Sequence, residues 1–304
     1  MIKSATTNQR AGFVTLIGAP NAGKSTLMNA MVGQKVSIVT PKVQTTRSRI
    51  RGIAMQDGAQ IIFVDTPGIF SPKRRLDRAM VNAAWRGAAD NDALLLLHDC
   101  ARAHLDDETK MIIAKLAEHK QPAALVLNKI DLAKQEQLLS RTAELSALFS
   151  FERVFMISAH SGSGLADLKS WLAQKMPSSS YLYDPDDLSD LPVRLLAAEI
   201  LREKLFLNLH QELPYQMTVE TESWVEREDG SAEVRLSVFV AREGHRGIVL
   251  GKGGQTIKRI GQAARRELEQ TLERRIHLMA HVKYRKDWME DKDRYTTWDL
   301  DFDA

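Results

Sequence analysis

The sequence has a single cysteine, few aromatic residues and no long apolar run. Because Cys100 cannot form a disulfide within the chain, a reducing compartment suits it. No apolar run approaches the roughly 20 residues that a membrane-spanning helix needs. Residues 1–12 are polar and lack the apolar stretch of a secretory signal, so we expect none. These absences exclude a disulfide-stapled secreted domain and a transmembrane helix.

Charge is the feature that is unevenly distributed. The chain has 304 residues, enough for two domains, and a net charge of only +3. Between Arg242 and Lys286, however, 12 Lys and Arg stand against 4 Asp and Glu, a net of +8. The rest of the chain then has 30 basic and 35 acidic residues, a net of −5. One basic region in an otherwise acidic chain indicates a polyanionic partner.

Short apolar runs alternate with helical patterns in the first half of the chain. The runs cover residues 13–17, 60–64, 93–97, 123–127 and 153–157. Several are continuously apolar, as expected of parallel strands covered on both faces. Strands that alternate with helices predict βαβ units and a doubly wound α/β sheet. Such sheets bind ligands beyond the carboxyl ends of their strands.

A phosphate-binding loop follows the first apolar run. It consists of Gly18, Ala19, Pro20, Asn21, Ala22, Gly23, Lys24, Ser25 and Thr26, with the spacing G-x-x-x-x-G-K-[ST]. Its glycines let successive N–H groups turn inward on a polyphosphate, and the following helix adds the positive end of its dipole. Lys24 is placed to reach the β- and γ-phosphates, and Ser25 offers a hydroxyl to Mg²⁺. The alternative is an ordinary glycine turn between a strand and a helix.

A second motif follows the run at 60–64 and comprises Asp65, Thr66, Pro67 and Gly68. An aspartate at this place can hold Mg²⁺, usually through water. A glycine at position 68 leaves the backbone free to approach a γ-phosphate and donate its N–H. Alone the motif would be an ordinary turn, but its distance from the phosphate loop makes the nucleotide interpretation strong.

Two motifs indicate a guanine site. They are the run Asn128, Lys129, Ile130 and Asp131, and the pair Ser158 and Ala159. The Asp131 carboxylate would accept hydrogen bonds from N1–H and the exocyclic amino group of guanine. Adenine lacks that pair of donors, and a buried carboxylate without partners is costly, so the site would reject adenine. Asn128 and the Lys129 stem would brace the base, while the Ala159 N–H would meet guanine O6.

Together these motifs resemble those of the translation-factor-related GTPases over the first 176 residues. The segment Pro41–Arg47 is similar to switch I of the bacterial Era family. In that family a threonine of this segment completes the Mg²⁺ shell in the GTP state, and by position we favour Thr46 over Thr45. The resemblance implies GTP or GDP as ligand, Mg²⁺ held by Ser25, Thr46 and Asp65, and a nucleotide site that includes Ile69.

The resemblance also bears on the mechanism. Many GTPases have a glutamine at the position of Ile69 to orient the attacking water, and isoleucine cannot replace it. Related GTPases without that glutamine use a K⁺ ion held by an asparagine of the phosphate loop, which corresponds to Asn21. Asn21 either takes that role or caps the loop. The implied catalytic residues are Asn21, Lys24, Thr46 and Gly68.

The C-terminal part of the chain predicts an RNA-binding module. A helix over 192–212, strands over 215–224, 232–241 and 276–284, and a G-x-x-G turn between helical segments give the order α-β-β-α-α-β. This order with a G-x-x-G turn is the signature of a KH domain, here of type II. The expected RNA contacts are Arg246, Ile248, Val249, Gly251, Lys252, Gly253, Gly254, Ile257, Lys258 and Arg259. The alternative is a solvated basic helix after a glycine turn.

The whole chain is therefore identified as a member of the Era family, a GTPase domain joined to a KH domain. The expected segments are a flexible tail (1–11), the GTPase domain (12–176), a linker (177–191), the KH domain (192–290) and an acidic C-terminal tail (291–304). Of this tail, we expect residues 299–304 to be disordered.

The resemblance implies a GTP-hydrolysing switch that binds 16S ribosomal RNA near its 3′ end and assists 30S subunit assembly. It further implies a cytoplasmic monomer that binds no DNA, with a peripheral fraction at the inner face of the membrane. Three alternatives stay open. They are a GTPase that couples another RNA to cell-cycle or membrane events, a small-molecule kinase, against which Asp131 speaks, and an RNA-binding protein with an inactive nucleotide site.

Overall fold

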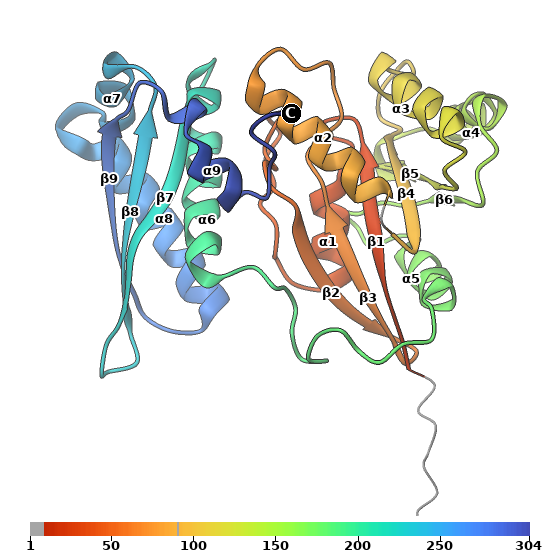
Figure 1. Ribbon diagram of the computed structural model, residues 1–304, viewed down its shortest axis with the longest axis horizontal. Helices are drawn as coiled ribbons and strands as arrows, with labels where there is room; N and C mark the ends of the chain where they lie inside the picture. Colours follow the sequence, from red (N-terminus) through yellow and green to blue (C-terminus); the bar gives the residue numbers. More distant parts are fainter. Residues whose placement is uncertain (1–8, 90) are drawn as a thin grey trace, which may run out of the picture. The chain divides into compact units, whose positions relative to one another are not determined.

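The computed structural model describes residues 9–89 and 91–304, which fall into two compact units (Figure 1). Unit 1 comprises residues 9–37, Thr46–Asp190 and Tyr295–Ala304. Unit 2 comprises Ile38–Thr45 and Leu191–Arg294. The chain therefore changes unit on either side of Ile38–Thr45, once more after Asp190, and again after Arg294.

Unit 1 alternates strands and helices along the chain. Its elements are β1 (Arg10–Gly18), α1 (Lys24–Val32), β2 (Ile50–Gln56), β3 (Ala59–Asp65), α2 (Arg75–Ala89), β4 (Ala93–Asp99), α3 (Asp107–Glu118), β5 (Ala124–Asn128), α4 (Gln135–Leu148), β6 (Val154–Met156) and α5 (Leu165–Lys175). The strand order is β2-β3-β1-β4-β5-β6. All neighbours pair in parallel except β2 and β3, which are antiparallel. This confirms the doubly wound α/β fold and adds the edge strand β2, which was not predicted because Arg51 and Gly52 interrupt its apolar pattern.

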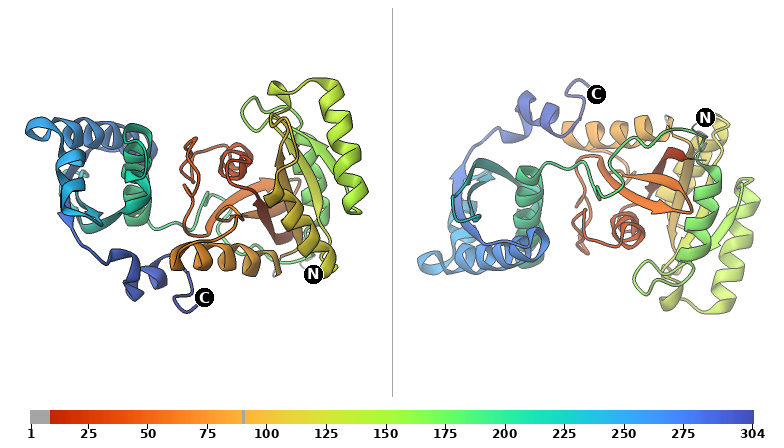
Figure 2. Two further views of the ribbon diagram at one scale, coloured as in Figure 1. Left: turned by 90° about the horizontal axis from the view of Figure 1, so that it is seen from above. Right: turned by 90° about the horizontal axis from the view of Figure 1, so that it is seen from below.

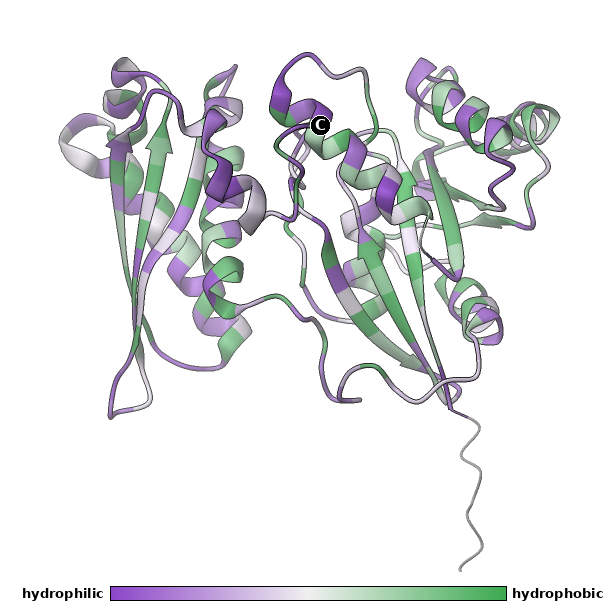
Figure 3. Ribbon diagram, in the orientation of Figure 1, coloured by the Kyte–Doolittle hydropathy of each residue, from purple (hydrophilic) through white to green (hydrophobic). Residues whose placement is uncertain are grey.

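The continuous apolar runs are explained by burial on both faces of this sheet. In β4, Leu95 and Leu97 pack into the cluster that includes α1 and α5. Leu94 and Leu96 face the other side and pack with residues of α2, α3 and α4. Figure 2 shows α1 and α2 on opposite sides of the sheet, and Figure 3 shows its strands mostly in the hydrophobic colour. The strand interiors therefore had to be mostly apolar, and the polar motifs begin where strands end.

Unit 2 has the predicted order of elements, which confirms the KH fold. These are α6 (Val193–Asn208), β7 (Met217–Glu226), β8 (Ala232–Val240), α7 (Glu243–Leu250), α8 (Gln255–Leu272) and β9 (Ile276–Tyr284). The next helix, α9 (Lys292–Thr297), begins in unit 2 and ends in unit 1. The sheet order is β7-β8-β9, antiparallel between β7 and β8 and parallel between β8 and β9. Apolar residues of α6 and α8 form one core with the inner face of the sheet.

The segments predicted to be loose are more ordered than their composition suggested. Residues 1–8 of the expected flexible tail lie outside the described ranges, whereas Arg10 and Ala11 belong to β1. The expected linker is bonded to unit 1, because Ala11 N donates to Pro177 O (3.1 Å) and Ile53 N to Leu188 O (2.9 Å). Of the helices in the described ranges, none combines the length and apolarity that crossing a bilayer requires.

The acidic tail also differs from the expected disorder. It includes α9, and its apolar residues Tyr295, Trp298 and Leu300 are buried in the fold. Composition had suggested disorder because every second residue from Asp299 to Asp303 is acidic. The alternation instead places Leu300 inward and leaves the three aspartates exposed.

Candidate functional site

The phosphate loop joins the end of β1 to the first residue of α1, so the helix N-terminus opens into the loop. Gly23 has a left-handed backbone (φ 97°), and a β-carbon at this position would overlap the Asn128 side chain. Both the backbone conformation and the lack of space therefore require glycine. The arrangement aims backbone N–H groups and the helix dipole at one point, as an anion site requires.

Lys24 lies at the centre of the loop and is only 6% exposed. Its Nζ donates to the carbonyl oxygens of Gly18 (3.0 Å) and Ala19 (3.1 Å). Burial lowers the pKa of Lys24 to about 8, although the charge of Asp65 offsets part of this shift. A polyphosphate would favour the charged ammonium, so binding a nucleotide would raise this pKa again.

Three side chains from separate elements meet beside Lys24. Ser25 Oγ donates to Asp65 Oδ2 (2.5 Å) and lies 3.0 Å from Thr46 Oγ1. Burial raises the pKa of Asp65, while its hydrogen bond from Ser25 and the charge of Lys24 act in the opposite direction. Asp65 Oδ1 is buried and has no hydrogen-bond partner in the described part of the chain.

This cluster fits Mg²⁺, a hard cation that prefers oxygen ligands and keeps several waters. Ser25 and Thr46 would hold the ion through their hydroxyls and Asp65 through water. When bound, the ion would neutralise charge on the β- and γ-phosphates. The orphaned Oδ1 atom supports this assignment, because a buried carboxylate oxygen without a partner is costly.

The structure separates Thr46 from its neighbour Thr45. Thr45 Oγ1 bonds to Thr40 Oγ1 (2.6 Å) and donates to Lys42 O (2.8 Å), all within unit 2. Thr46 Oγ1 instead lies near Ser25 and, at 3.4 Å, Asp65 Oδ2. The geometry therefore supports the sequence-based preference for Thr46.

Two residues that support Asp65 were not predicted. Ser37 Oγ donates to Asp65 Oδ2 (3.0 Å). The amide of Asn29, on α1, accepts hydrogen bonds from the backbone N–H groups of Val36 and Ser37, both at 2.9 Å. Ser37 stands inside an apolar run and Asn29 inside a helical pattern, so neither carried a recognisable signal.

The motif after β3 approaches the phosphate loop closely. Thr66 Oγ1 donates to Leu16 O (2.7 Å) in the sheet. A β-carbon at Gly68 would lie 2.9 Å from Pro20 Cα, so only glycine fits there without moving the loop. Pro67 lies between Thr66 and Gly68 in the chain and so links these two contacts.

Ile69 does not belong to the nucleotide site, which corrects our expectation. Its N–H donates to Gly18 O (3.1 Å), and its side chain is fully buried in the core between the sheet, α2 and α3. Both its backbone donor and its side chain are therefore used by the fold. The structure thus explains why an apolar residue stands here, since the chain needs a core residue at this place.

Asn128 connects the base-recognition motif to the phosphate loop. Its Nδ2 donates to Ala22 O (2.9 Å), and its Oδ1 accepts the N–H of Ala159 (3.0 Å). The Ala159 N–H is therefore engaged within the protein, unlike the expected contact with guanine O6. Ser158 is fully buried and its Oγ accepts the N–H of Ser161 (3.1 Å), which closes the turn after β6.

Lys129 and Asp131, the residues expected to brace and recognise the base, lie on the turn that follows β5. Lys129 has a left-handed backbone (φ 65°), and its Nζ forms an ion pair with Asp99 Oδ2 (2.7 Å). Ile130 N donates to Ile157 O (3.2 Å), which fixes the turn to the neighbouring strand end. Asp131 is exposed, so its carboxylate is accessible to a base.

Asp99 and Arg102 are residues of this site that the sequence did not reveal. Arg102 Nη2 donates to Pro20 O (2.9 Å) in the phosphate loop, and its Nη1 pairs with Asp106 Oδ2 (3.1 Å). Asp99 ends β4 and orients Lys129. Both lie at or just after a strand end, which was the available signal, but no motif marked them.

The G-x-x-G turn of unit 2 presents an open, basic surface. Gly254 has φ 77°, and a β-carbon there would meet nothing within 4 Å. The cations around it are exposed, namely Arg246, Lys252, Lys258 and Arg259. Gly251 and Gly253 also have positive φ angles, which lets the turn present its backbone. This surface can approach a phosphate backbone closely.

The apolar part of this surface differs from our expectation. Ile248 is 59% exposed and is available to a base. Val249, the next residue on the same helix, points inward. It is fully buried in the core of unit 2 and cannot contact a ligand. Ile257 is 9% exposed and belongs mainly to the same core. Of the predicted apolar contacts, Ile248 therefore remains.

Two family models match the chain. Residues 13–129 match the model described as 50S ribosome-binding GTPase, and residues 212–289 match the KH domain. A protein of Dinoroseobacter shibae named GTPase Era is 55% identical over 96% of this chain and 96% of its own length. GTPase Era of Afipia carboxidovorans is also 55% identical, over 96% of this chain and 95% of its own.

Solved structures give the same result. A single-residue variant of Aquifex aeolicus Era bound to GDP and AlF4⁻ has a TM-score of 0.89 and 33% identity, covering 95% of this chain and 99% of that one. A second Era structure, in complex with MgGDPNP and nucleotides 1506–1542 of 16S ribosomal RNA, has the same TM-score and identity and covers 95% of this chain and 98% of that one.

Nucleotide affinity should depend on the titration of Lys24. In the protein without nucleotide, Lys24 has a pKa of about 8, and a polyphosphate favours its charged form. GTP affinity should therefore be full below pH 8 and fall above it. The fall should approach about tenfold per pH unit. Calorimetry in buffers of different ionisation enthalpy measures both the affinity and the proton uptake. Lys24→Arg stays charged and reports any titration of guanine itself, so an equal pH profile in both proteins would contradict the assignment.

Thr46 and Thr45 provide a matched pair. We expect Thr46→Val to raise the Mg²⁺ concentration needed for single-turnover GTP hydrolysis by about 10–100-fold, because a hydroxyl at the ion is lost. Thr45→Val should hydrolyse GTP nearly as the unaltered protein does, since its hydroxyl bonds elsewhere. GDP affinity serves as the control for folding. A larger effect at Thr45 than at Thr46 would reverse the assignment.

Proposed function

The chain belongs to the Era family of GTPases, and on that premise we propose that it uses GTP hydrolysis to control its binding to the 3′ region of 16S ribosomal RNA. Through this cycle it would assist assembly of the 30S subunit. The chain is a GTPase that converts GTP to GDP and phosphate, and its nucleotide site and KH domain lie in one polypeptide. We propose that the nucleotide bound at this site controls RNA binding by the KH domain.

The course of the switch I segment carries this proposal. Thr46 lies at Ser25 and Asp65 in unit 1, whereas the residues just before it belong to unit 2. There Val39 N donates to Glu203 Oε1 (2.9 Å), and Lys42 Nζ donates to Phe206 O, both on α6. A γ-phosphate with its Mg²⁺ orders this kind of segment, and hydrolysis releases it. The nucleotide state would therefore act on a segment whose other end is bonded to the first helix of the KH domain.

The basic G-x-x-G surface supports RNA as the partner. Its exposed cations neutralise phosphates, its glycines allow close backbone approach, and Ile248 offers an apolar contact to a base. The Era structure that contains nucleotides of 16S ribosomal RNA supports this RNA in particular. The alternative is the same switch acting on another RNA in cell-cycle or membrane events. Work on the 30S subunit would place the monomer in the cytoplasm, with any membrane association peripheral.

We also propose that K⁺ takes part in hydrolysis. Because Ile69 is buried in the core, its position supplies no side chain to hold the attacking water. Asn21 lies in the phosphate loop with a left-handed backbone (φ 64°). An amide oxygen suits a weakly hydrated cation. Such an ion would neutralise charge that develops at the phosphates.

Asn21→Ala tests the K⁺ proposal. We expect hydrolysis to be faster in KCl than in NaCl for the unaltered protein, and this difference to disappear in the variant. The loss in rate should be about 10²-fold, typical of removing one stabilising contact to developing charge. GDP affinity should change little. Full stimulation by K⁺ in the variant would remove Asn21 from this role.

Two glycines of unit 2 test the RNA surface. Gly254→Asp adds a negative charge and a strained backbone at the turn, so affinity for an oligonucleotide of the 16S 3′ end should fall by at least about tenfold. Gly230→Asp makes the same change at another exposed glycine of positive φ, in the β7–β8 turn, and should bind normally. Fluorescence anisotropy with GTP analogue and with GDP measures the effect. Equal binding of a scrambled oligonucleotide would favour the alternative RNA, and intact binding by Gly254→Asp would reject this surface.

A further inference from the structure

Residues 295–304, called here the C-terminal segment, form part of unit 1. Tyr295, Trp298 and Leu300 are 1%, 7% and 6% exposed, whereas Asp299 and Asp301 lie outside. The segment is also folded on itself, because the ring of Tyr295 packs edge-on against that of Phe302 near the chain end (5.0 Å between centroids). The segment therefore buries its rings and carries carboxylates at exposed positions.

The surface beneath it carries arginines that contact this segment. We call them the arginine face, and they are Arg47, Arg49, Arg75, Arg78 and Arg86.

Three arginines of this face make polar contacts with the C-terminal segment. Arg49 forms an ion pair with Asp299, and Arg86 Nη2 donates to the carbonyl oxygen of Asp299 (3.5 Å). Arg78 Nε donates to the carbonyl oxygen of Ala304 (3.3 Å). The segment is therefore held at its middle and at its last residue.

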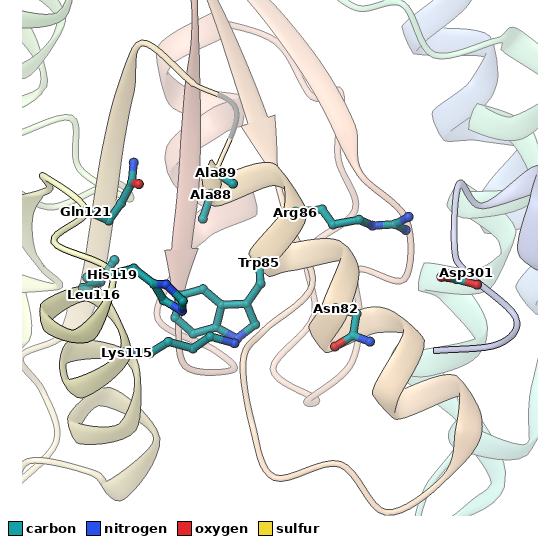
Figure 4. A pocket seen from close by; sticks show the side chains of 10 residues that line it. All are labelled: Asn82, Trp85, Arg86, Ala88, Ala89, Lys115, Leu116, His119, Gln121 and Asp301. Carbon is teal, nitrogen blue, oxygen red and sulfur yellow. The ribbon is translucent and has the colours of Figure 1, made fainter.

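Cation–π contacts add to these bonds. The Arg75 guanidinium carbon lies 4.4 Å from the centroid of the Phe302 ring, and that of Arg47 lies 6.0 Å from the Trp298 ring. Figure 4 shows Arg86 directed towards the stretch of chain that carries Asp301. Both residues line a pocket of about 410 Å³ that continues along α2 to Trp85. Each of these polar and cation–π contacts is weak by itself, so the segment is held by several of them together with its buried rings.

The arginine face belongs to the two segments that a GTPase moves. Arg47 and Arg49 closely follow Thr46, and Arg75, Arg78 and Arg86 lie on α2, which comes after the Gly68 motif. In GTPases the γ-phosphate and its Mg²⁺ order both of these regions. The C-terminal segment thus bridges the flanks of switch I and switch II on the outside of the nucleotide site.

We propose that the C-terminal segment is a clasp that stabilises the ordered arrangement of both switch segments, with Thr46 against Ser25 and Asp65. This rests on the proposed GTP switch. GTP uses that arrangement through its γ-phosphate, whereas GDP has no group that requires it. By linkage, a clasp that favours the arrangement raises the affinity for GTP and leaves that for GDP nearly unchanged.

The clasp continues directly from a fixed point of unit 2. Arg294 is 5% exposed, and its Nη1 donates to Trp288 O (3.0 Å) while its guanidinium carbon lies 4.8 Å from the centroid of the Phe239 ring. The next residue is Tyr295, the first of the clasp. The clasp that contacts the switch segments is therefore the direct continuation of the KH domain along the chain.

Asp299→Lys in the full chain tests the clasp, because it replaces the partner of Arg49 with a like charge. We expect the affinity for a Mg²⁺-bound, non-hydrolysable GTP analogue to fall about fivefold, the lower end of typical coupling between sites. Affinity for Mg²⁺-bound GDP should stay within about twofold, since GDP does not use the arrangement. Calorimetry measures both. Asp303→Lys is the matched control, because Asp303 is exposed and its N–H turns back to Asp301 (3.0 Å).

Charge exchange separates the clasp from a general loss of stability. Arg49→Glu combined with Asp299→Lys should restore most of the preference for the GTP analogue. Unchanged affinities in Asp299→Lys, an equal fall for both nucleotides, or no recovery in the double variant would each overturn the clasp while leaving the GTPase intact. Failure of the unaltered protein to bind either guanine nucleotide would instead overturn the proposed function, and the clasp with it.

Discussion

The buried carboxylate of Asp65 is the constraint on which unit 1 depends. It ends the fully buried strand β3, and three hydroxyl groups converge on it, those of Ser25, Ser37 and Thr46. A charge in this position is costly without compensation, and burial raises its pKa accordingly. Lys24 supplies part of the compensation and Mg²⁺ would supply the rest. The phosphate loop and switch I are thus held together by the need to satisfy one carboxylate.

The unit boundaries give this local chemistry a wider effect. The switch I segment has Thr46 in unit 1 and Val39 in unit 2, bonded to α6. At the other end of the chain, Arg294 is fixed in unit 2 and Tyr295 is buried in unit 1. Both passages lead to residues next to the switch segments. A nucleotide-dependent change in these segments therefore has two covalent routes to the RNA-binding domain, in addition to the linker.

Much of the fold and site was predictable because its signals are local. A continuous apolar run followed by a glycine-bounded loop specifies a strand, an anion site and a helix within a few residues. The helices and strands of unit 2 were predictable for the same reason. Among the predictions that the structure corrected, those of Ile69 at the nucleotide and Val249 at the RNA surface concerned the direction of a side chain. Both residues point into a core whose other members lie far away in the sequence.

By itself, the sequence determined the chemical groups of this protein, namely a phosphate loop, a carboxylate at Asp131 and a basic G-x-x-G turn. Only the tertiary structure decided which groups meet. It placed Thr46 rather than Thr45 at Asp65, and it bonded the Ala159 N–H to the side chain of Asn128. It also brought Arg102 to the phosphate loop and packed the acidic C-terminal segment against arginines. The physical reason is that motif spacing is fixed by the local backbone, whereas these contacts arise from packing between distant parts of the chain.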